Sequence, residues 1–281
     1  MGENTYNLTG KSCPACPDWP RLRKRCCFAP GLPEERKKQL GDVDALLSRA
    51  EPVKVSNSTT AGVASVGAEK FFIKRSNVPS WCDRFRRLGR LSRAERNELF
   101  SRRIAALGIR VPAVWMSVST SSWGMPGPSY LVTEYFPGVM NAADNFGTML
   151  AKAPPPVWIR RMTEIMARLH EAGIVHGDLK MVNFLALPGK GPDGFELGLF
   201  DFDGTSATHG ACPRRVRRRE LARAVSSFYD FLTRAGKGGE YSLAAVTALW
   251  CRDYHAAGAP DFSGDRKLVR RIGQFCRRTR R

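Results

Sequence analysis

The chain has 281 residues, of which 43% are hydrophobic, so it can bury a sizeable core and suits one or two domains. Its apolar runs are short and interrupted by charge, which excludes a bilayer-spanning segment, and no secretory signal is recognisable. The 45 Lys and Arg residues exceed the 26 Asp and Glu residues, and the net charge of +19 favours polyanionic partners. We therefore expect a cytoplasmic protein with a basic surface.

The eight cysteines are expected to be reduced thiols, because disulfides are rare in the cytoplasm. Cys13 and Cys16 have the spacing of zinc ligands, and Cys26 and Cys27 follow ten residues later. Adjacent cysteines suit a zinc knuckle poorly, and no histidine lies nearby. Zinc binding by these four residues is therefore the less favoured of two interpretations.

The first half of the chain changes its hydrophobic period twice. Residues 1–50 predict an N-terminal extension, irregular to residue 30 and followed by one helix that opens at Pro33. Three short strands then follow, at 53–55, 62–66 and 70–74. Ser92 and Glu95 form a capping-box pattern, which predicts a helix that ends at Gly108.

The second half is mostly helical in pattern. Two strands, 114–118 and 130–135, are expected first, with residues 119–129 as the turn between them. A short helix within 141–153 precedes a long one, whose buried stripe is Trp158, Met162, Ile165, Met166 and Leu169. The remaining expected elements are a hairpin of 184–187 with 196–200, and helices near 214, at 243–255 and at 265–278.

The stretch 176–183, HGDLKMVN, carries the clearest chemical signal, together with DFDG eighteen residues later. Such an acid and amide on one loop, with a second acid after an apolar strand, serve in-line phosphoryl transfer from a metal nucleotide. Asp178 is the candidate catalytic base, and Lys180 could neutralise charge on the migrating phosphoryl group. Asn183 and Asp201 are candidate ligands for Mg2+, which prefers hard oxygen donors. We interpret His176 as a structural residue that pins the loop.

Lys74 is the candidate contact to the α and β phosphates, because it ends a strand with the pattern apolar-apolar-Lys. A lysine in this role needs a carboxylate partner on the next helix. Capping would occupy Glu95, so we prefer Glu98 as the partner, although the buried face of the helix lies nearer to Asn97.

The motifs HGDLKMVN and FDFDG resemble those of the protein-kinase-like superfamily. Within it the chain most resembles the bacterial lipopolysaccharide core kinases, which phosphorylate Kdo or heptose sugars. The resemblance covers roughly residues 50–235 and includes AERNELFSRRIAALGIRVP, YLVTEYFPG, IMARLHEAGIVHGDLK and RRVRRRELARAVSSF. It implies ATP, Mg2+ (with Mn2+ as an alternative) and a glycolipid acceptor, the lipopolysaccharide core on a lipid A precursor. The family's catalytic, metal and phosphate-lysine positions correspond to Asp178, to Asn183 and Asp201, and to Lys74.

The resemblance implies an α+β, protein-kinase-like, two-lobed fold, with a small antiparallel sheet and one main helix preceding a mostly helical lobe. The expected segments are a 1–50 extension, a 51–136 nucleotide-clamping lobe, a 137–276 lobe and a 277–281 basic tail. The turn before Gly62 would lie over the phosphates, although it lacks a complete glycine-rich pattern. Backbone groups near Glu134 and Phe136 are expected to take the adenine edge.

Two departures from protein kinases indicate a small or glycolipid hydroxyl as acceptor. Gly177 replaces the arginine that reads a phosphorylated activation loop, and little room for such a loop separates Asp201 from residue 214. An atypical serine/threonine kinase and a non-catalytic, polyanion-binding scaffold on this fold remain the alternatives. The basic clusters 84–90 and 214–219 would draw the protein to the anionic inner face of the inner membrane. Nucleic acid is not expected, because aromatic residues are not interleaved with the clusters.

Overall fold

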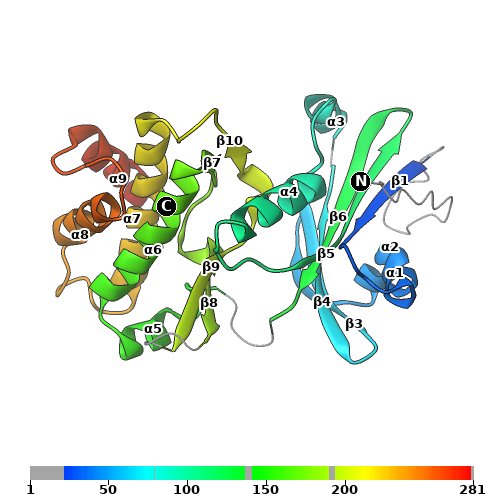
Figure 1. Cartoon of the computed structure of the whole chain (residues 1–281), viewed down its shortest axis with the longest axis horizontal. Coiled ribbons are helices and arrows are strands. Elements are labelled where there is room, and N and C mark those ends of the chain that lie inside the picture. Colours follow the sequence, from blue (N-terminus) through cyan, green and yellow to red (C-terminus); the bar gives the residue numbers. More distant parts are fainter. Residues whose placement is uncertain (1–21, 79, 137–140, 190–193, 280–281) are drawn as a thin grey trace. The chain divides into compact units, whose positions relative to one another are not determined.

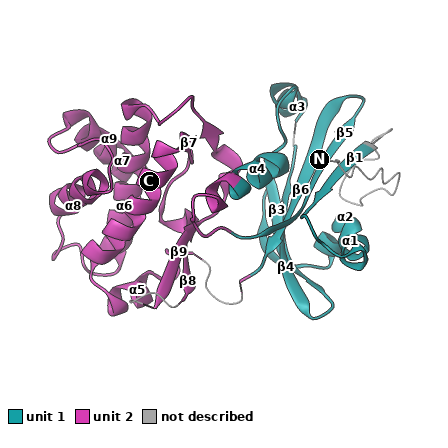
Figure 2. Cartoon of the chain, viewed as in Figure 1, with its two compact units in different colours: residues 1–102, 112–135 teal, residues 103–111, 136–281 magenta. Residues whose placement is uncertain are grey.

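The computed structural model describes residues 22–78, 80–136, 141–189 and 194–279. The chain divides into two compact units, which Figure 2 distinguishes by colour. Unit 1 comprises residues 1–102 and 112–135, and unit 2 comprises residues 103–111 and 136–281. None of the helices in the described ranges is both long and apolar enough to cross a membrane.

Unit 1 is built on a six-stranded antiparallel sheet (Figure 1) with the strand order β1-β5-β6-β4-β3-β2. The strands are β1 Leu22–Phe28, β2 Glu51–Val55, β3 Thr59–Val66, β4 Glu69–Ser76, β5 Val114–Ser122 and β6 Met125–Glu134. The helices of this part of the chain are α1 Glu34–Gly41, α2 Val43–Ser48, α3 Trp81–Arg87 and α4 Arg93–Ala105.

One face of this sheet forms the core of unit 1 with α1 and α2. Phe71 and Ile73 of β4 point to this face, because side chains alternate along a strand. They join Leu40, Val43 and Leu46 of the two helices in one buried cluster. Lys74, next to Ile73, therefore belongs to the opposite face of the sheet.

Three sequence-based expectations for unit 1 were wrong in detail. Residues 22–28 are not irregular: they form the edge strand β1, which pairs with β5. The single helix expected after Pro33 is two helices, because Asp42 interrupts it and its side chain caps α2 by accepting from the Ala45 N–H. The long turn expected at 119–129 is mostly strand, because Trp123 and Gly124 both have positive φ, as two-residue hairpin turns require.

Unit 2 is mainly helical, and its helices match those expected from the sequence. They are α5 Phe146–Lys152, α6 Pro155–Glu171, α7 Arg214–Arg234, α8 Leu243–Ala256 and α9 Arg266–Thr279. The whole predicted stripe of α6 is buried. α6 packs on α8, and α7 packs on α9 and α8. The basic tail expected from residue 277 is helical up to Thr279, and residues 280–281 lie outside the described residues.

Two short antiparallel ladders in unit 2 position the two loops that carry the sequence motifs. β7 Ile174–Val175 pairs with β10 Ser206–Ala207, and β8 Phe184–Pro188 pairs with β9 Phe195–Leu199. The loop 176–183 joins β7 to β8 and contains the 3-10 helix η1 Met181–Asn183. The segment that begins at Asp201 joins β9 to β10 and contains η2 Phe202–Gly204. Each of the two predicted loops therefore connects one ladder to the other.

Candidate active site

Asn183 closes the 176–183 loop on itself. Its side-chain Nδ2 lies 2.7 Å from the Asp178 carbonyl oxygen and 3.4 Å from Asp178 Oδ2, and Asn183 is buried. Because the amide nitrogen is used within the loop, the amide oxygen is the atom that remains suited to a metal ion. The five-residue spacing in the sequence thus corresponds to direct side-chain contact.

His176 links this loop to the strand that precedes Asp201. Its Nε2 lies 3.2 Å from the Phe200 carbonyl oxygen, and its Nδ1 accepts from the Asp178 N–H at 3.4 Å. This pair of partners corresponds to the neutral ring with the proton on Nε2. Complete burial lowers the pKa of His176 below its ordinary value of 6.5 and outweighs the attraction of nearby carboxylates such as Glu220. These contacts fit the interpretation of His176 as a structural residue that pins the loop.

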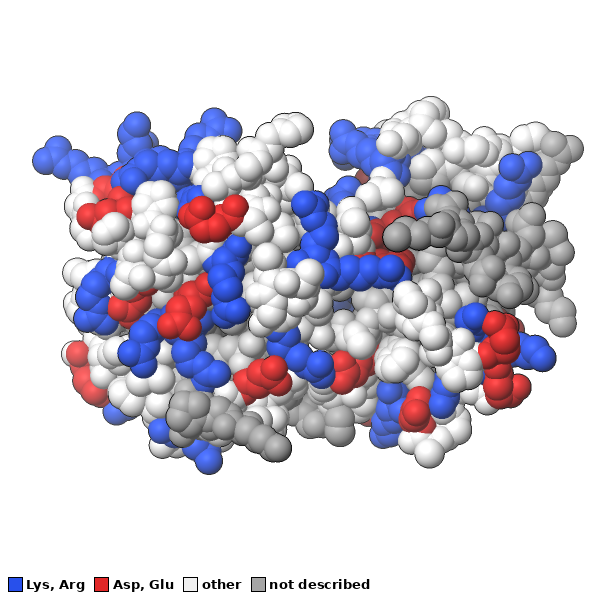
Figure 3. All heavy atoms as spheres, viewed as in Figure 1, with Lys and Arg blue, Asp and Glu red and all other residues white. Residues whose placement is uncertain are grey.

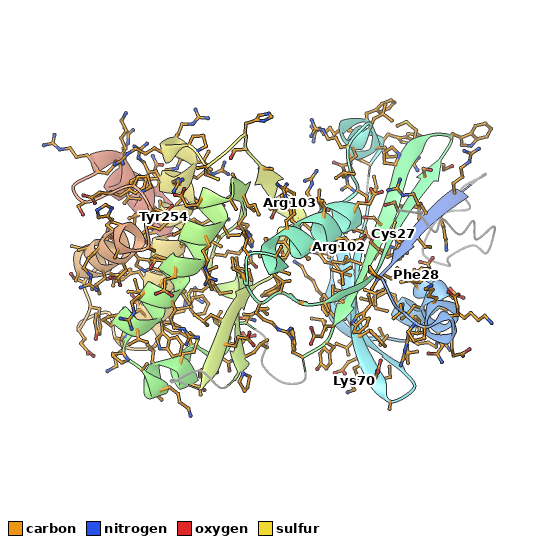
Figure 4. All side chains as sticks on the ribbon, in the orientation of Figure 1. Cys27, Phe28, Lys70, Arg102, Arg103 and Tyr254 are labelled. Carbon is orange, nitrogen blue, oxygen red and sulfur yellow. The ribbon has the colours of Figure 1, made fainter. Side chains whose placement is uncertain are left out.

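Glu220 of α7 binds the backbone of the same loop. We did not single it out from the sequence. Its carboxylate accepts from the backbone N–H groups of His176 at 3.0 Å and Gly177 at 2.6 Å, and contacts His170 Nε2 at 3.1 Å. Burial opposes its charge, but the hydrogen bond from His170 and the other contacts prevail and lower the pKa of Glu220. His170 is itself held by Tyr254 of α8, which Figure 4 labels. One signal was available: Glu220 is the only acid among residues 214–229 of a basic helix.

Gly177 has a local reason to be glycine. Its φ is +86°, and a Cβ at this position would lie 2.4 Å from the Gly204 carbonyl oxygen. The loop and η2 therefore approach each other so closely that no side chain fits between them. This packing explains the absence of an arginine here independently of the acceptor.

The Asp178 carboxylate lies between two cations. Lys180 Nζ is 3.0 Å from Oδ2, and an Arg223 nitrogen from α7 is 2.5 Å from Oδ1. Each of the three side chains is about one third exposed, so the cluster is accessible to solvent. Arg223 is a second residue that the sequence did not single out; its guanidinium lies 5.5 Å from the ring centroid of Phe275 in α9.

Asp201 adopts a left-handed backbone conformation, with φ +64° and ψ +69°. In the described residues the only other non-glycine residue with positive φ is Trp123. Few non-glycine residues adopt this conformation, and aspartate is among those that tolerate it best, so a left-handed backbone is compatible with an acid at this position. The Phe200 N–H donates to the Asn183 carbonyl oxygen at 3.1 Å, so the chain enters Asp201 directly beside Asn183.

The donor set of this region fits Mg2+. An amide oxygen and a carboxylate are hard ligands, and Mg2+ uses one or two protein carboxylates together with substrate phosphates. The described part of the chain holds no cluster of three or more His, Cys, Asp or Glu side chains able to bind a metal by themselves. One amide oxygen and one carboxylate suit a metal that substrate phosphates also hold, and binding by Asn183 and Asp201 stays a prediction.

In unit 1, Glu98 of α4 lies on the face of the sheet to which Lys74 belongs. Lys74 is opposite Leu131, and Leu131 is opposite Ser117 of β5, so the three form one row across the sheet. The Ser117 hydroxyl donates to Glu98, which also pairs with Arg102 at 2.6 Å. Glu98 thus lies over the row that contains Lys74.

Glu95 is occupied as the capping box predicted. Its Oε2 accepts from the Ser92 N–H at 2.8 Å, and its own N–H donates to the Ser92 hydroxyl at 3.1 Å. Its other oxygen lies 2.7 Å from Arg25 of β1. Both acids are thus engaged within unit 1, and the preference for Glu98 as the partner of Lys74 stays a prediction.

Gly62 lies inside β3 and not in a turn, because the turn that precedes β3 closes between Ser56 and Thr59. A Cβ on Gly62 would meet the Glu51 carbonyl oxygen at 2.8 Å and the Ala50 Cβ at 2.9 Å. The close approach of β2 accounts for this glycine, and a contact to phosphate stays a prediction.

The expected adenine-binding stretch coincides with a boundary in the chain. Unit 1 ends at Tyr135 and unit 2 resumes at Phe136. The Glu134 N–H donates to the Ala113 carbonyl oxygen at 2.8 Å, so this N–H is already used in a hydrogen bond within unit 1. The Phe136 ring lies 5.1 Å from the guanidinium of Arg110. Adenine binding by the backbone here also stays a prediction.

The four cysteines considered for zinc do not gather into a site within the described residues. Cys13 and Cys16 lie outside these residues. Cys26 is buried in the core of unit 1, and the adjacent Cys27 points to the other face of the sheet (Figure 4). Burial raises the pKa of both thiols, which disfavours the thiolate that zinc requires.

Comparisons with known proteins identify the family. A solved structure described as WaaP in complex with acyl carrier protein matches with a TM-score of 0.62 and 19% identity, over 90% of this chain and 98% of that one. A Rio2 kinase–ADP/Mg2+-phosphoaspartate complex from Chaetomium thermophilum matches with a TM-score of 0.45 and 13% identity, over 86% of this chain and 75% of that one. No curated protein sequence matches the chain.

The WaaP match confirms the expected protein-kinase-like α+β fold. The model of the lipopolysaccharide kinase (Kdo/WaaP) family matches residues 67–247, which is more than half of the chain and includes Lys74, the loop 176–183 and Asp201. The resemblance inferred from the motifs is thus confirmed, and the chain is a phosphotransferase that belongs to the lipopolysaccharide kinase (Kdo/WaaP) family.

Proposed function

We propose that the protein transfers the γ-phosphoryl group of ATP to a hydroxyl of a Kdo or heptose sugar in the lipopolysaccharide core. The observation that carries this proposal is the closed loop in which Asn183 contacts Asp178 while its backbone binds the residue before Asp201. Family membership supplies the lipopolysaccharide substrate class. The loop supplies the chemistry.

Asp178 would act as the base. Its carboxylate would orient the sugar hydroxyl and take its proton late, because a sugar hydroxyl has a pKa far above neutrality. Lys180 and Arg223 place two positive charges beside it, where negative charge moves during phosphoryl transfer. Arg223 would also bind a phosphate already present on the acceptor, since guanidinium groups match phosphate geometry.

Asn183 and Asp201 would hold Mg2+, with Mn2+ as an alternative. When bound, the ion would neutralise charge on the nucleotide phosphates. Lys74, oriented by Glu98, would contact the α and β phosphates, and Gly62 would lie near them. The adenine edge would meet the backbone near Glu134 and Phe136.

The acceptor is a lipid, so we place the enzyme at the cytoplasmic face of the inner membrane, as a peripheral protein. The net charge of +19 would favour an anionic surface. Because the matched WaaP structure is a complex with acyl carrier protein, producing this chain with and without such a protein is a sensible first comparison.

The direct test is transfer of labelled phosphate from ATP to purified core lipopolysaccharide, with Mg2+, by the wild type and by Asp178→Asn. We expect transfer by the wild type only, and none to casein or to the protein itself. Asp230→Asn is the matched control, since Asp230 lies on α7 in an i, i+4 pair with Arg234. Transfer to casein would support the protein-kinase alternative, and equal ATP turnover by wild type and Asp178→Asn would support the scaffold.

The sugar itself can be identified in cells. Mass spectrometry of core sugars from a strain that lacks this protein should show the loss of one phosphate, from Kdo or from heptose. An unchanged core would contradict the proposal.

A further inference from the structure

Helix α3 exposes its large apolar side chains and buries an arginine, the opposite of an ordinary surface helix. Trp81 and Phe85 are each 63% exposed, and Leu88, which caps the helix, is 52% exposed. Their i, i+4, i+7 spacing places them on one stripe. Arg84, between them, is 2% exposed. The large apolar side chains thus face solvent while an arginine faces the protein.

This orientation is held by specific hydrogen bonds. Arg84 Nε donates to the Pro126 carbonyl oxygen of β6 at 3.1 Å, and Arg87 donates to the Asn77 carbonyl oxygen at 3.2 Å. The Arg84 guanidinium lies 5.0 Å from the centre of the Trp81 ring, and the Ser80 hydroxyl caps the helix by accepting from the Asp83 N–H. The exposed stripe is therefore a fixed feature of unit 1.

Two further exposed apolar side chains belong to segments that adjoin α3. Leu91, just beyond the helix, is 49% exposed. Trp123 is 64% exposed at the tip of the β5–β6 hairpin, three residues before the Pro126 that binds Arg84. Nine large hydrophobic side chains are exposed in the described residues, and five of them, including all the aromatic ones, belong to this region. Such clustering marks an interaction surface.

The same segment is strongly basic. Residues 80–94 contain five arginines and one acid, Asp83, which pairs with the Ser80 hydroxyl. Arg86 and Arg90 are exposed. Figure 3 shows Lys and Arg atoms gathered around the position of α3, next to uncharged surface. Indole and phenyl groups flanked by arginine suit the boundary between acyl chains and anionic head groups.

We propose that this surface (Trp81, Phe85, Leu88, Leu91 and Trp123, with Arg86 and Arg90) docks unit 1 on an anionic phospholipid bilayer. The apolar side chains insert among the acyl chains, and the two arginines bind lipid phosphates. This proposal rests on the proposed lipid acceptor for its purpose, but the binding itself requires neither ATP nor catalysis. It differs from attraction by net charge alone, because it needs the apolar stripe.

The test is co-sedimentation of the full-length protein with vesicles of phosphatidylcholine, alone or mixed with phosphatidylglycerol. The Trp81→Ser/Phe85→Ser variant should lose at least about tenfold in partitioning to the mixed vesicles. The Val53→Ser/Val55→Ser variant is the matched control, since these β2 side chains are 56% and 75% exposed, and it should bind like the wild type. Arg86→Gln/Arg90→Gln should reduce the preference for phosphatidylglycerol.

Two further measurements separate this proposal from the proposed function. Asp178→Asn should bind vesicles like the wild type, and the Trp81→Ser/Phe85→Ser variant should still phosphorylate a core oligosaccharide freed of lipid. Unchanged vesicle binding by the Trp81→Ser/Phe85→Ser variant would overturn the docking surface. The docking surface would also be overturned if this variant lost binding to an acidic protein, such as acyl carrier protein, and kept its binding to vesicles.

Discussion

Replacing Glu220 tests whether α7 holds the candidate catalytic loop in place. The carboxylate is 4% exposed and receives two backbone N–H groups and one histidine ring nitrogen. Glu220→Ala would leave these groups buried without an acceptor. Glu220→Gln would keep the shape, but its NH2 group would face at least one of the donors.

The cost follows from the number of bonds lost. Removing one partner of a buried, charged network typically costs about 3–5 kcal/mol, so we expect that loss for Glu220→Ala. Glu220→Gln should cost about 2–3 kcal/mol, since roughly one charge-assisted bond is lost. At about 2–4 °C per kcal/mol, the alanine variant should melt roughly 6–20 °C lower. Displacement of the loop by about 1 Å should also lower kcat about 100-fold.

The assay combines thermal unfolding with kinase kinetics at fixed Mg2+. A positioning role predicts that kcat falls while the KM for ATP changes little, because Glu220 contacts the backbone of the loop that carries Asp178. Asp230→Asn, on the same helix, should change neither quantity. The reasoning is refuted if Glu220→Ala melts within about 1 °C of the wild type or retains its kcat.

The lowered pKa of Glu220 adds a pH signature. A carboxyl group whose pKa is lower in the folded state stabilises the protein above its ordinary value of 4.5 and loses this contribution as the pH falls through the folded value. Acid unfolding of the wild type should therefore steepen below about pH 4.5. The Glu220→Gln variant should show a shallower slope in the same range.

Five other substitutions give separable outcomes. Asp178→Asn should lower kcat at least about 1,000-fold without lowering the melting temperature. Glu98→Gln should lower kcat by about 10–100-fold. Glu95→Gln should instead lower the free energy of unfolding by about 1 kcal/mol, as measured by denaturant unfolding. The opposite pattern would reverse the roles of the two acids. Gly177→Ala should cost about 2–3 kcal/mol, because its φ and the 2.4 Å approach both exclude a Cβ; a neutral effect on melting would contradict this. Because burial lowers the pKa of His176, we expect the wild type to lose stability as the pH falls below 6.5, by up to about 1.4 kcal/mol per pH unit. His176→Asn should remove this pH-dependent loss.

Elements with a strong local period were predictable from the sequence. The alternation in β4 and the stripe of α6 both reflect burial of one face, and such periods are visible in a single chain. β1 was missed because its sequence, LRKRCCF, is basic, and because its partner β5 lies about ninety residues away. As an edge strand it pairs with one neighbour only, which allows charged residues that a central strand would exclude.

The candidate site, too, has a part that the sequence predicted and a part that only the folded structure shows. By itself, the sequence predicted a chemistry for the loop, because Asp178 and Asn183 are close enough along the chain for their spacing to carry the signal. Only the tertiary structure decided what supports that loop: Glu220 reaches it from 44 residues away, and Arg223 reaches Asp178 from the same helix. It also decided that α3 turns an arginine inward and its aromatic side chains outward. Hydrogen bonds between distant segments have no local period, so they emerge only when the chain is folded.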